Sequence, residues 1–238
     1  MCSAWAEAGH RAVLLTQHEP QQYQSGVKDI FDFYGVEKNF KLIRIPSFSR
    51  NLIFAHLYGI LCGLYGLLSR PDIVYGREGS GLYWTALFRL PTVFEIHNPQ
   101  VLDGFYPRKL ITLRAFSHLV VISTELKKLV EQRGFTRPVL VAHDGADQEI
   151  LPLKIPAHIE SHLQDQTVKI GYTGHLYPGK GGELIIRIAT LCPSMKFHLF
   201  GGEEPDVQRL QASAPSNVVF HGFIPQSLIG TVQQRMDI

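Results

Sequence analysis

The chain has 238 residues and a mass of 26.8 kDa, enough for two domains of ordinary size. Apolar residues make up 45% and charged residues 18%, which excludes disordered and collagen-like classes. The net charge is only +2 and no basic block stands out, so a nucleic-acid partner bound through its phosphates is not expected.

The cysteines and the N-terminus bear on the compartment. Cys2, Cys62 and Cys192 are odd in number and form no Cys-x-x-Cys pair. This argues against a disulfide scaffold or a zinc knuckle and fits a reducing environment. The first ten residues lack both a basic start and a long apolar run, so they do not resemble a signal peptide. We therefore expect a soluble cytoplasmic protein.

Helix and strand patterns alternate from the N-terminus onward. A short helix ends at Gly9, since glycine just past a helix end accepts the left-handed conformation. Strands are then predicted at 12–16, 40–46, 71–75, 92–96, 119–122 and 139–142. Helices are predicted at 52–68, 82–90, 108–116 and 125–132, the last with Ser123 as its N-cap. Strands with little polar alternation between helices indicate parallel sheets covered on both faces.

The most apolar stretch of the chain is 52–68. Its length is at the lower limit for spanning a bilayer, and it contains His56 and several glycines. We interpret it as a buried or membrane-facing helix of a soluble domain rather than as a transmembrane span.

A second α/β series follows a break in the pattern. Residues 148–167 contain Pro152, Pro156 and a polar run, and we predict an inter-domain connection there. Strands are then predicted at 168–172, 196–200 and 217–221, and helices at 183–191, 206–212 and 228–235. The sequence thus predicts two doubly wound, Rossmann-like parallel-sheet domains, at 1–147 and 168–238, with the ligand site in the cleft between them.

Both ends of the chain lack parts that such domains normally have. No strand precedes the first helix, and Asp237-Ile238 has the pattern of a strand that is just beginning. We therefore expect the chain to be a piece of a larger fold, without its first strand and its C-terminal part.

The sharpest local motif is Gly174-His-Leu-Tyr-Pro-Gly179-Lys180-Gly181-Gly182, between a strand and a helix. Its Gly-x4-Gly-Lys spacing is close to that of a phosphate-binding loop, but Gly181 stands where a P-loop ATPase needs Ser or Thr to hold magnesium. What remains is an anion site made by amides at a helix N-terminus and one lysine. The alternative is a tight turn with a solvated lysine.

Several motifs follow each other at the spacing of a known family. Gly171-Tyr-Thr-Gly-His-Leu-Tyr-Pro-Gly-Lys-Gly181 precedes Phe197-His-Leu-Phe-Gly-Gly202 and Asn217-Val-Val-Phe-His-Gly-Phe-Ile-Pro225. Upstream lie Val93-Phe-Glu-Ile-His97, Val120-Val-Ile-Ser123 and Val141-Ala-His-Asp-Gly-Ala-Asp147. In this order the motifs resemble the retaining, GT-B-fold glycosyltransferases of family four, which use a nucleotide sugar. The resemblance covers nearly the whole chain.

The resemblance implies that the second domain binds the donor. Lys180 resembles the lysine that binds the donor diphosphate and stabilises the leaving group. His175 stands where the family has an arginine, and Gly174 resembles the glycine whose close backbone approach leaves room for the donor. The other expected donor contacts come from a glycine-rich strand end and from the turn whose backbone reads the base. They are Gly201, Gly202, His221, Gly222, Phe223 and Ile224.

The resemblance also assigns residues in the first, acceptor-side domain. His97 resembles a residue that contacts the transferred sugar, and with Lys180 it is the expected catalytic pair. The alternative for His97 is a hydrogen-bonded histidine at a strand end. Glu95 is expected to point away from His97 and to be structural. Gly145 and Asp147, near the hinge, form either a structural turn or a donor contact.

Other motifs give weaker evidence of function. Gly76-Arg-Glu-Gly-Ser-Gly81 is not a dinucleotide fingerprint, and we predict a tight turn near the acceptor. The eleven histidines show no metal-binding spacing, so neither a metal nor another cofactor is expected. No Gly-x-Ser-x-Gly turn supports serine hydrolysis.

The resemblance implies transfer of a sugar, with retention, from a nucleotide-sugar donor to a lipid-linked glycan, a polysaccharide or a small metabolite. Contact with the inner face of a membrane through 52–68 is expected. The family's first glycine-rich loop and its pair of glutamates lie outside this sequence, so we expect a fragment with reduced or no activity. Two alternatives stay open: a nonenzymatic nucleotide-sugar-binding remnant and a P-loop nucleotide hydrolase.

Overall fold

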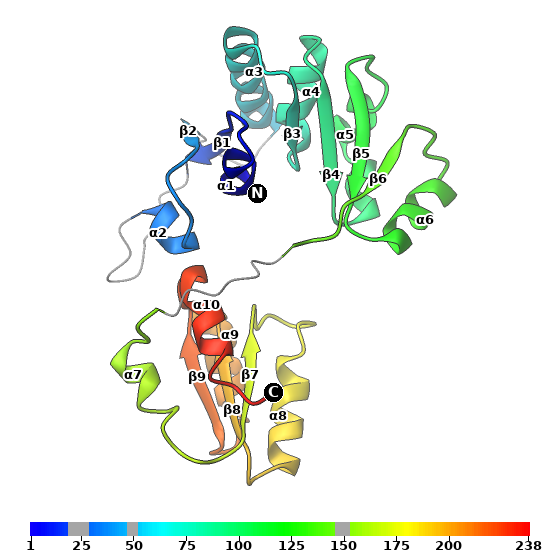
Figure 1. Cartoon of the computed structure of the whole chain (residues 1–238). Coiled ribbons are helices and arrows are strands. Elements are labelled where there is room, and N and C mark those ends of the chain that lie inside the picture. Colours follow the sequence, from blue (N-terminus) through cyan, green and yellow to red (C-terminus); the bar gives the residue numbers. More distant parts are fainter. Residues whose placement is uncertain (19–28, 47–51, 146–152) are drawn as a thin grey trace. The chain divides into compact units, whose positions relative to one another are not determined.

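The computed structural model describes residues 1–18, 29–46, 52–145 and 153–238 (Figure 1). The chain divides into two compact units. Unit 1 comprises Met1–Pro20 and Phe40–Ala146, and unit 2 comprises Gln21–Asn39 and Asp147–Ile238. Both units are built from parallel strands with helices between them, which confirms the predicted fold class.

The strands of unit 1 form parallel sheets. β1 (Val13–His18) pairs with β2 (Lys41–Pro46). A separate sheet has the order β3 (Val74–Gly76), β4 (Thr92–Ile96), β5 (Phe116–Val121) and β6 (Val139–Val141). Phe94, Phe116, Leu119 and Val121 are completely buried there, which explains why these strands lack polar alternation.

The α-helices of unit 1 follow the prediction with shifts at their ends, and one short 3₁₀-helix (η) has no predicted counterpart. They are α1 (Cys2–Glu7), α3 (Leu52–Ser69), α4 (Gly79–Leu87), η1 (Pro99–Asp103), α5 (Phe105–Leu110) and α6 (Thr124–Gln132). Ser123 Oγ accepts the N–H of Leu126 at 3.1 Å, so it caps α6 as predicted. The helix predicted at 108–116 ends at Leu110 instead, because the chain turns to bring Phe116 into β5.

The turn that leads into α4 is held by its own side chain. Glu78 accepts the N–H groups of Ser80 and Gly81 at 2.9 and 2.6 Å, and so caps the first turn. The helix therefore begins earlier than predicted.

Unit 2 has a sheet in the order β7 (Lys169–Thr173), β8 (Lys196–Phe200) and β9 (Val218–Gly222). Its helices include α8 (Gly182–Leu191), α9 (Glu204–Gln211) and α10 (Gln226–Gln233). The backbone of Asp237 and Ile238 bonds to β7: Asp237 N–H donates to Lys169 O at 2.9 Å, and Gly171 N–H donates to Ile238 O at 2.8 Å. These residues therefore pair with β7 as a strand would.

Two further helices of unit 2 have no counterpart among the predicted elements. α2 (Ile30–Tyr34) lies against α10, and the ring of Phe33 stacks on that of Phe223 at 6.0 Å. α7 (Ala157–Glu160) places Ile159, completely buried, in a cluster with Phe200 and Val232.

Both helices extend unit 2 beyond the predicted domain at 168–238. α2 comes from the stretch 1–147, and α7 from the stretch 148–167 that we predicted to be a connection. Residues 148–152 of that connection lie outside the described residues.

A histidine pair lies inside the sheet of unit 2. His198 on β8 is completely buried, and its Nδ1 lies 2.9 Å from Nε2 of His221 on β9. The His221 ring stacks on Phe200 at 4.4 Å, with His162 beside it at 5.8 Å. Burial, together with the neighbouring histidines, lowers the pKa of His198 to about 4 and that of His221 to about 3. Both imidazoles are therefore neutral at pH 7.

This pair predicts that unit 2 loses stability in mild acid. Because both folded-state pKa values lie below the ordinary 6.5, the unfolded chain binds more protons. The stabilisation is complete above about pH 6.5 and is lost as the pH falls towards about 4, with uptake of up to about two protons on unfolding. Urea unfolding followed by circular dichroism across this range measures it, and the fluorescence of Trp5 and Trp84 reports unit 1 separately.

The variant His221→Phe keeps a flat ring on Phe200 and removes one titrating group. We expect it to reduce the pH dependence by about one proton, because His198 is then the one titrating member of the pair. Equal slopes in His221→Phe and the wild type would contradict the assignment.

Candidate functional site

Glycines from three separate motifs meet at the carboxyl ends of β7, β8 and β9. Gly174 follows β7, Gly201 follows β8 and Gly222 ends β9. The Gly174 N–H donates to Phe200 O at 2.9 Å, and the Gly201 N–H donates to Gly222 O at 2.7 Å. The structure therefore brings together residues that the sequence named one motif at a time. Ligands of open parallel sheets bind at these strand ends.

The contact between the first two strand ends requires glycine. A Cβ on Gly201 would lie 2.2 Å from the carbonyl oxygen of Gly174, and the φ of Gly201 is +112°. Gly202 has φ +84°, and a Cβ there would lie 2.7 Å from the buried side chain of Leu176. Side chains at either position would push the loop after β7 away from the sheet.

Hydrogen bonds close the loop that carries the lysine. The Tyr172 hydroxyl lies 2.8 Å from His175 O and 3.1 Å from Lys180 O, so these two loop carbonyls share its single proton. Gly179 and Gly181 have φ +92° and +90°, and Gly181 is the N-cap of α8. The loop therefore places Lys180 directly before the first turn of a helix, where N–H groups lack intrahelical partners.

The two polar side chains of this loop face solvent. Lys180 is exposed, and its Nζ lies 5.4 Å from the centre of the Tyr177 ring. Among the described residues it has no ion-pair partner. His175 is also exposed, with its ring 5.6 Å from that of Tyr177. One cation and one imidazole are thus available to an anion that binds at this helix N-terminus.

Arg209 on α9 holds this loop, and no sequence motif indicated it. Its Nη2 donates to Leu176 O at 2.8 Å, and its Nη1 donates to Glu183 Oε1 at 2.5 Å. A backbone hydrogen bond in the first turn of α8, together with Arg209, lowers the pKa of Glu183. Arg209 thereby neutralises a carboxylate that would otherwise repel an anion at this helix end.

Two side chains at the turn after β9, those of His221 and Ile224, pack against the interior of unit 2. The His221 side chain belongs to the buried pair, and Ile224 packs in the cluster of Phe200 and Val232. Phe223 is about half exposed and stacks on Phe33. The His221 and Ile224 side chains are therefore engaged, and at these two positions a ligand would meet backbone.

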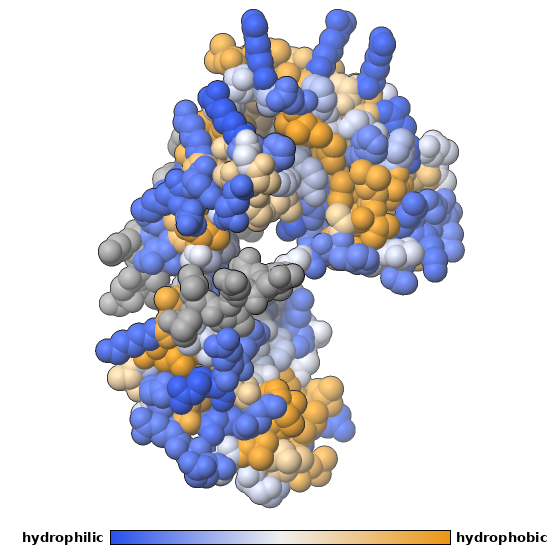
Figure 2. All heavy atoms as spheres, viewed as in Figure 1, coloured by the Kyte–Doolittle hydropathy of each residue, from blue (hydrophilic) through white to orange (hydrophobic). Residues whose placement is uncertain are grey.

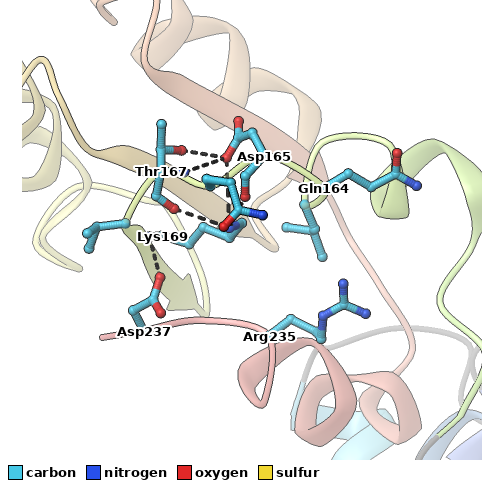
Figure 3. A pocket seen from close by; sticks show the side chains of 9 residues that line it. Gln164, Asp165, Thr167, Lys169, Arg235 and Asp237 are labelled. Carbon is cyan, nitrogen blue, oxygen red and sulfur yellow. Dashed lines mark hydrogen bonds and ion pairs between the residues drawn. The ribbon is translucent and has the colours of Figure 1, made fainter.

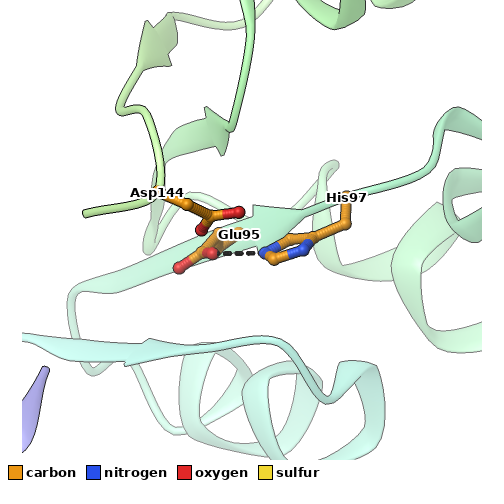
Figure 4. A group of neighbouring side chains, drawn as sticks. All are labelled: Glu95, His97 and Asp144. Carbon is orange, nitrogen blue, oxygen red and sulfur yellow. Dashed lines mark hydrogen bonds and ion pairs between the residues drawn. The ribbon is translucent and has the colours of Figure 1, made fainter. Parts of the chain in front are cut away.

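A second polar group gathers at strand ends in unit 1 (Figure 4). Oε1 of the buried Glu95 lies 2.6 Å from His97 Nε2 and 2.6 Å from Arg77 Nη2, while the Tyr75 hydroxyl donates to Oε2. The expectation that Glu95 points away from His97 is wrong, because residues two apart in a strand share a face.

This carboxylate orients His97. Burial raises the pKa of Glu95, but hydrogen bonds from Tyr75, His97 and Arg77 outweigh that effect and hold the pKa below its ordinary value. With Nε2 donating to an ionised carboxylate, a neutral His97 presents Nδ1 as an acceptor. The His97 side chain is 38% exposed, so it can reach a ligand.

Asp144, which follows β6, completes a set of possible metal ligands. One atom each from Glu95, His97 and Asp144 lie within 4.8 Å of one another. Arg77 already pairs with the same Glu95 oxygen, so a cation would have to compete with a guanidinium for it. Local spacing of histidines could not indicate this group, because two strand ends assemble it.

The remaining predicted residues near the hinge give little information. Gly145 is exposed, and a Cβ there would meet no atom within 4 Å. Asp147 lies outside the described residues. Their alternative roles stay predictions.

A hollow of about 470 Å³ lies beside the first residues of β7, at the strand end opposite the glycines (Figure 3). Its charges are already paired. Asp165 bonds to Lys196 and Thr167, whose hydrogen bonds lower the pKa of Asp165, and the Lys169 N–H donates to Asp237 at 2.8 Å. The glycine-lined strand ends are therefore the better candidate for a ligand site.

Comparisons with known proteins bear on the fold. No protein-family model matches the sequence, and neither does any curated protein sequence. Among solved structures, HepE of Anabaena in complex with UDP and glucose matches with a TM-score of 0.63 and 19% identity, over 84% of this chain and 60% of HepE. Sucrose-phosphate synthase of Thermosynechococcus elongatus matches with a TM-score of 0.70 and 12% identity, over 99% and 66%. The chain has a GT-B-type fold.

A third neighbour shows what this likeness leaves open. The UDP-GlcNAc 2-epimerase of Neisseria meningitidis, bound to UDP-GlcNAc, matches with a TM-score of 0.52 and 14% identity, over 92% of this chain and 67% of the epimerase. A synthase and an epimerase thus share the fold, so function has to be argued from the site. The chain spans about three fifths of HepE's length.

The glycine contact predicts a sharp difference between two alanine variants. Gly179→Ala introduces backbone strain without a clash and should cost about 1–2 kcal/mol. Gly201→Ala adds a clash with Gly174 O and should cost about 2–5 kcal/mol. Urea unfolding followed by circular dichroism measures both, and equal destabilisation would contradict the close approach.

Proposed function

We propose that this chain is part of a nucleotide-sugar-dependent glycosyltransferase and that unit 2 binds the donor through its diphosphate. One observation carries the proposal: an exposed lysine without an ion-pair partner among the described residues lies between glycine-lined strand ends and a helix N-terminus. Such an arrangement favours a phosphate-rich anion, because the glycines let it come close to the backbone N–H groups of the protein. The UDP and UDP-sugars bound to the neighbouring structures support UDP as the nucleotide.

The chemistry assigned to this loop is stabilisation of the leaving diphosphate. As the bond between the sugar's anomeric carbon and the phosphate oxygen breaks, negative charge grows on the diphosphate. Lys180 and the first-turn amides of α8 offset that charge without moving, because the loop is already held by Tyr172 and Arg209. Retention of anomeric configuration rests on the family resemblance.

His97 is the residue of unit 1 that we assign to the transferred sugar. A sugar hydroxyl can donate to Nδ1 while Glu95 holds Nε2. Glu95, Tyr75 and Arg77 then act as positioning residues. The proposed acceptor is a glycan, a lipid-linked glycan or a small hydroxylated metabolite, in cytoplasmic polysaccharide biosynthesis.

A nonenzymatic donor-binding protein is the second candidate. It rests on His175, which stands where the resembled family has an arginine. Both candidates bind UDP at the same loop, and only turnover separates them. The full chain is incubated with UDP-glucose and a set of glycan and small hydroxylated acceptors, whose oxygen takes the glucosyl group as UDP leaves. Release of UDP that depends on an acceptor supports an enzyme, and binding of UDP-glucose without release supports the binding protein.

The proposal predicts that UDP affinity depends on Lys180. Lys180→Ala should weaken UDP binding by roughly 1.5–3 kcal/mol, the scale of a charge-assisted hydrogen bond, or about 10- to 150-fold in Kd. Lys154→Ala is the matched control, since Lys154 is another exposed lysine of unit 2 outside the loop. Calorimetry that finds the same affinity for Lys180→Ala and the wild type would remove the assigned site.

The P-loop hydrolase alternative can be tested through its requirement for magnesium. A nucleotide hydrolase would release phosphate from ATP only with magnesium, and Gly181 leaves no hydroxyl to hold that ion. We expect no magnesium-dependent phosphate release. Release that disappears in Lys180→Ala would favour the hydrolase.

A further inference from the structure

Helix α3 is attached to unit 1 through a face made of glycines. A Cβ on Gly59 would lie 2.3 Å from the Trp84 ring, and one on Gly63 would lie 2.5 Å from the Phe88 ring. A Cβ on Gly66 would lie 2.4 Å from Leu90. Because α3 approaches α4 this closely, it is packed as part of the unit and is not free to leave it.

The opposite face of α3 is apolar and exposed. We define the α3 face as six outward Leu and Ile side chains that recur every three or four residues along the helix: Ile53, Leu57, Leu61, Leu64, Leu67 and Leu68. Leu68 is 85% exposed, Ile53 is 73% exposed, and the others lie between 41% and 50%. The helix contains no Asp, Glu, Lys or Arg.

Length and composition alone would let α3 cross a membrane. Among the described residues, α3 is the helix that is long and apolar enough to do so, and only 28% of it is buried. Its packing on α4 favours a helix that lies on a membrane instead, since crossing would expose Tyr58 and Cys62 of the core.

Arginines lie at the end of unit 1 where α3 terminates. Arg70 follows the helix, Arg89 follows α4, and Arg114 precedes β5, and all three are exposed. None of them has an ion-pair partner within the described ranges. Figure 2 shows hydrophilic side chains projecting from this end of unit 1, where Figure 1 draws the last turn of α3. The loops that carry these arginines contain one acidic residue, Asp72, and the exposed Ile73, and Leu87, the last residue of α4, is also exposed.

We propose that the α3 face and its three arginines bind unit 1 to the surface of an anionic lipid bilayer. The leucines would enter the boundary between headgroups and acyl chains, and the arginines would contact lipid phosphates. This inference is independent of the donor site, which lies in unit 2.

The chemistry of the α3 face favours lipid over a second protein. The large side chains exposed on this face are all aliphatic, and the polar ones beside them offer little to orient a partner, since Tyr65 is half-buried and the Ser69 hydroxyl donates to Gly66 O. Protein interfaces are instead enriched in aromatic residues, methionine and arginine at their centres and surround them with polar groups. The positive charge at one end adds attraction for anionic lipid specifically.

Vesicle co-sedimentation of the full chain tests the proposal. The probes are vesicles of phosphatidylcholine alone and of phosphatidylcholine with about 30% phosphatidylglycerol, at low and high salt. We expect binding to the anionic vesicles that weakens with salt. The triple variant Leu61→Gln, Leu64→Gln, Leu68→Gln should lose at least about tenfold in partitioning.

Two further variants make the result specific. Arg70→Gln with Arg89→Gln and Arg114→Gln should lose about tenfold or more on anionic vesicles and little on neutral ones. The matched control replaces exposed leucines elsewhere, Leu129→Gln, Leu140→Gln and Leu191→Gln, and should bind as the wild type does. Circular dichroism verifies that each variant is folded.

Three outcomes would overturn the proposal. The wild type could fail to bind anionic vesicles, or the control triple could lose as much binding as the α3 triple. Sedimentation could also show a dimer in solution that the α3 triple dissociates, with no binding to vesicles. That last result would assign the α3 face to a second copy of the chain.

Discussion

The close approach of Gly201 to the Gly174 carbonyl is the constraint on which the site in unit 2 depends. With no side chain between them, the loop after β7 rests directly on the end of β8, and the Gly201 N–H continues the contact to β9. Leu176 then fills the space beside Gly202 and anchors the loop in the core. In this packing Tyr172 and Arg209 donate hydrogen bonds to loop carbonyls, and Lys180 lies at the start of α8.

Both units use the carboxyl ends of parallel strands in the same way, and the α3 face lies elsewhere. In each unit a charged residue holds the polar group that is offered to a ligand: Arg209 secures the lysine loop in unit 2, and Glu95 orients His97 in unit 1. In unit 1 the arginines near α3 belong to the opposite strand ends, so a membrane could bind there without covering His97.

Local patterns predicted the strands closely, because Thr92–Ile96 and Lys196–Phe200 are buried on both sides and their apolar runs are unbroken. The glycine motifs could likewise be interpreted from the sequence, since a positive φ and the close approach of two backbone segments both require glycine. Long-range contacts could not be predicted from local patterns. Arg77, Arg209 and Asp144 acquire their partners only when strand ends or neighbouring helices meet. The predicted direction of the Glu95 side chain was wrong because the two-residue period of a strand was misapplied. Helix α2 was not predicted because its five residues are too few to show a helical period.

The most direct test of the donor site is an NMR titration of the full chain, isotopically labelled at glycine, with UDP. Unit 2 carries Gly174, Gly179, Gly181, Gly201 and Gly202 at the proposed diphosphate site, whereas Gly9 and Gly134 lie in unit 1 with open space around them. The account predicts that UDP shifts the amide signals of the first group and leaves those of Gly9 and Gly134 in place. A titration in which UDP moves none of the five site glycines would contradict it.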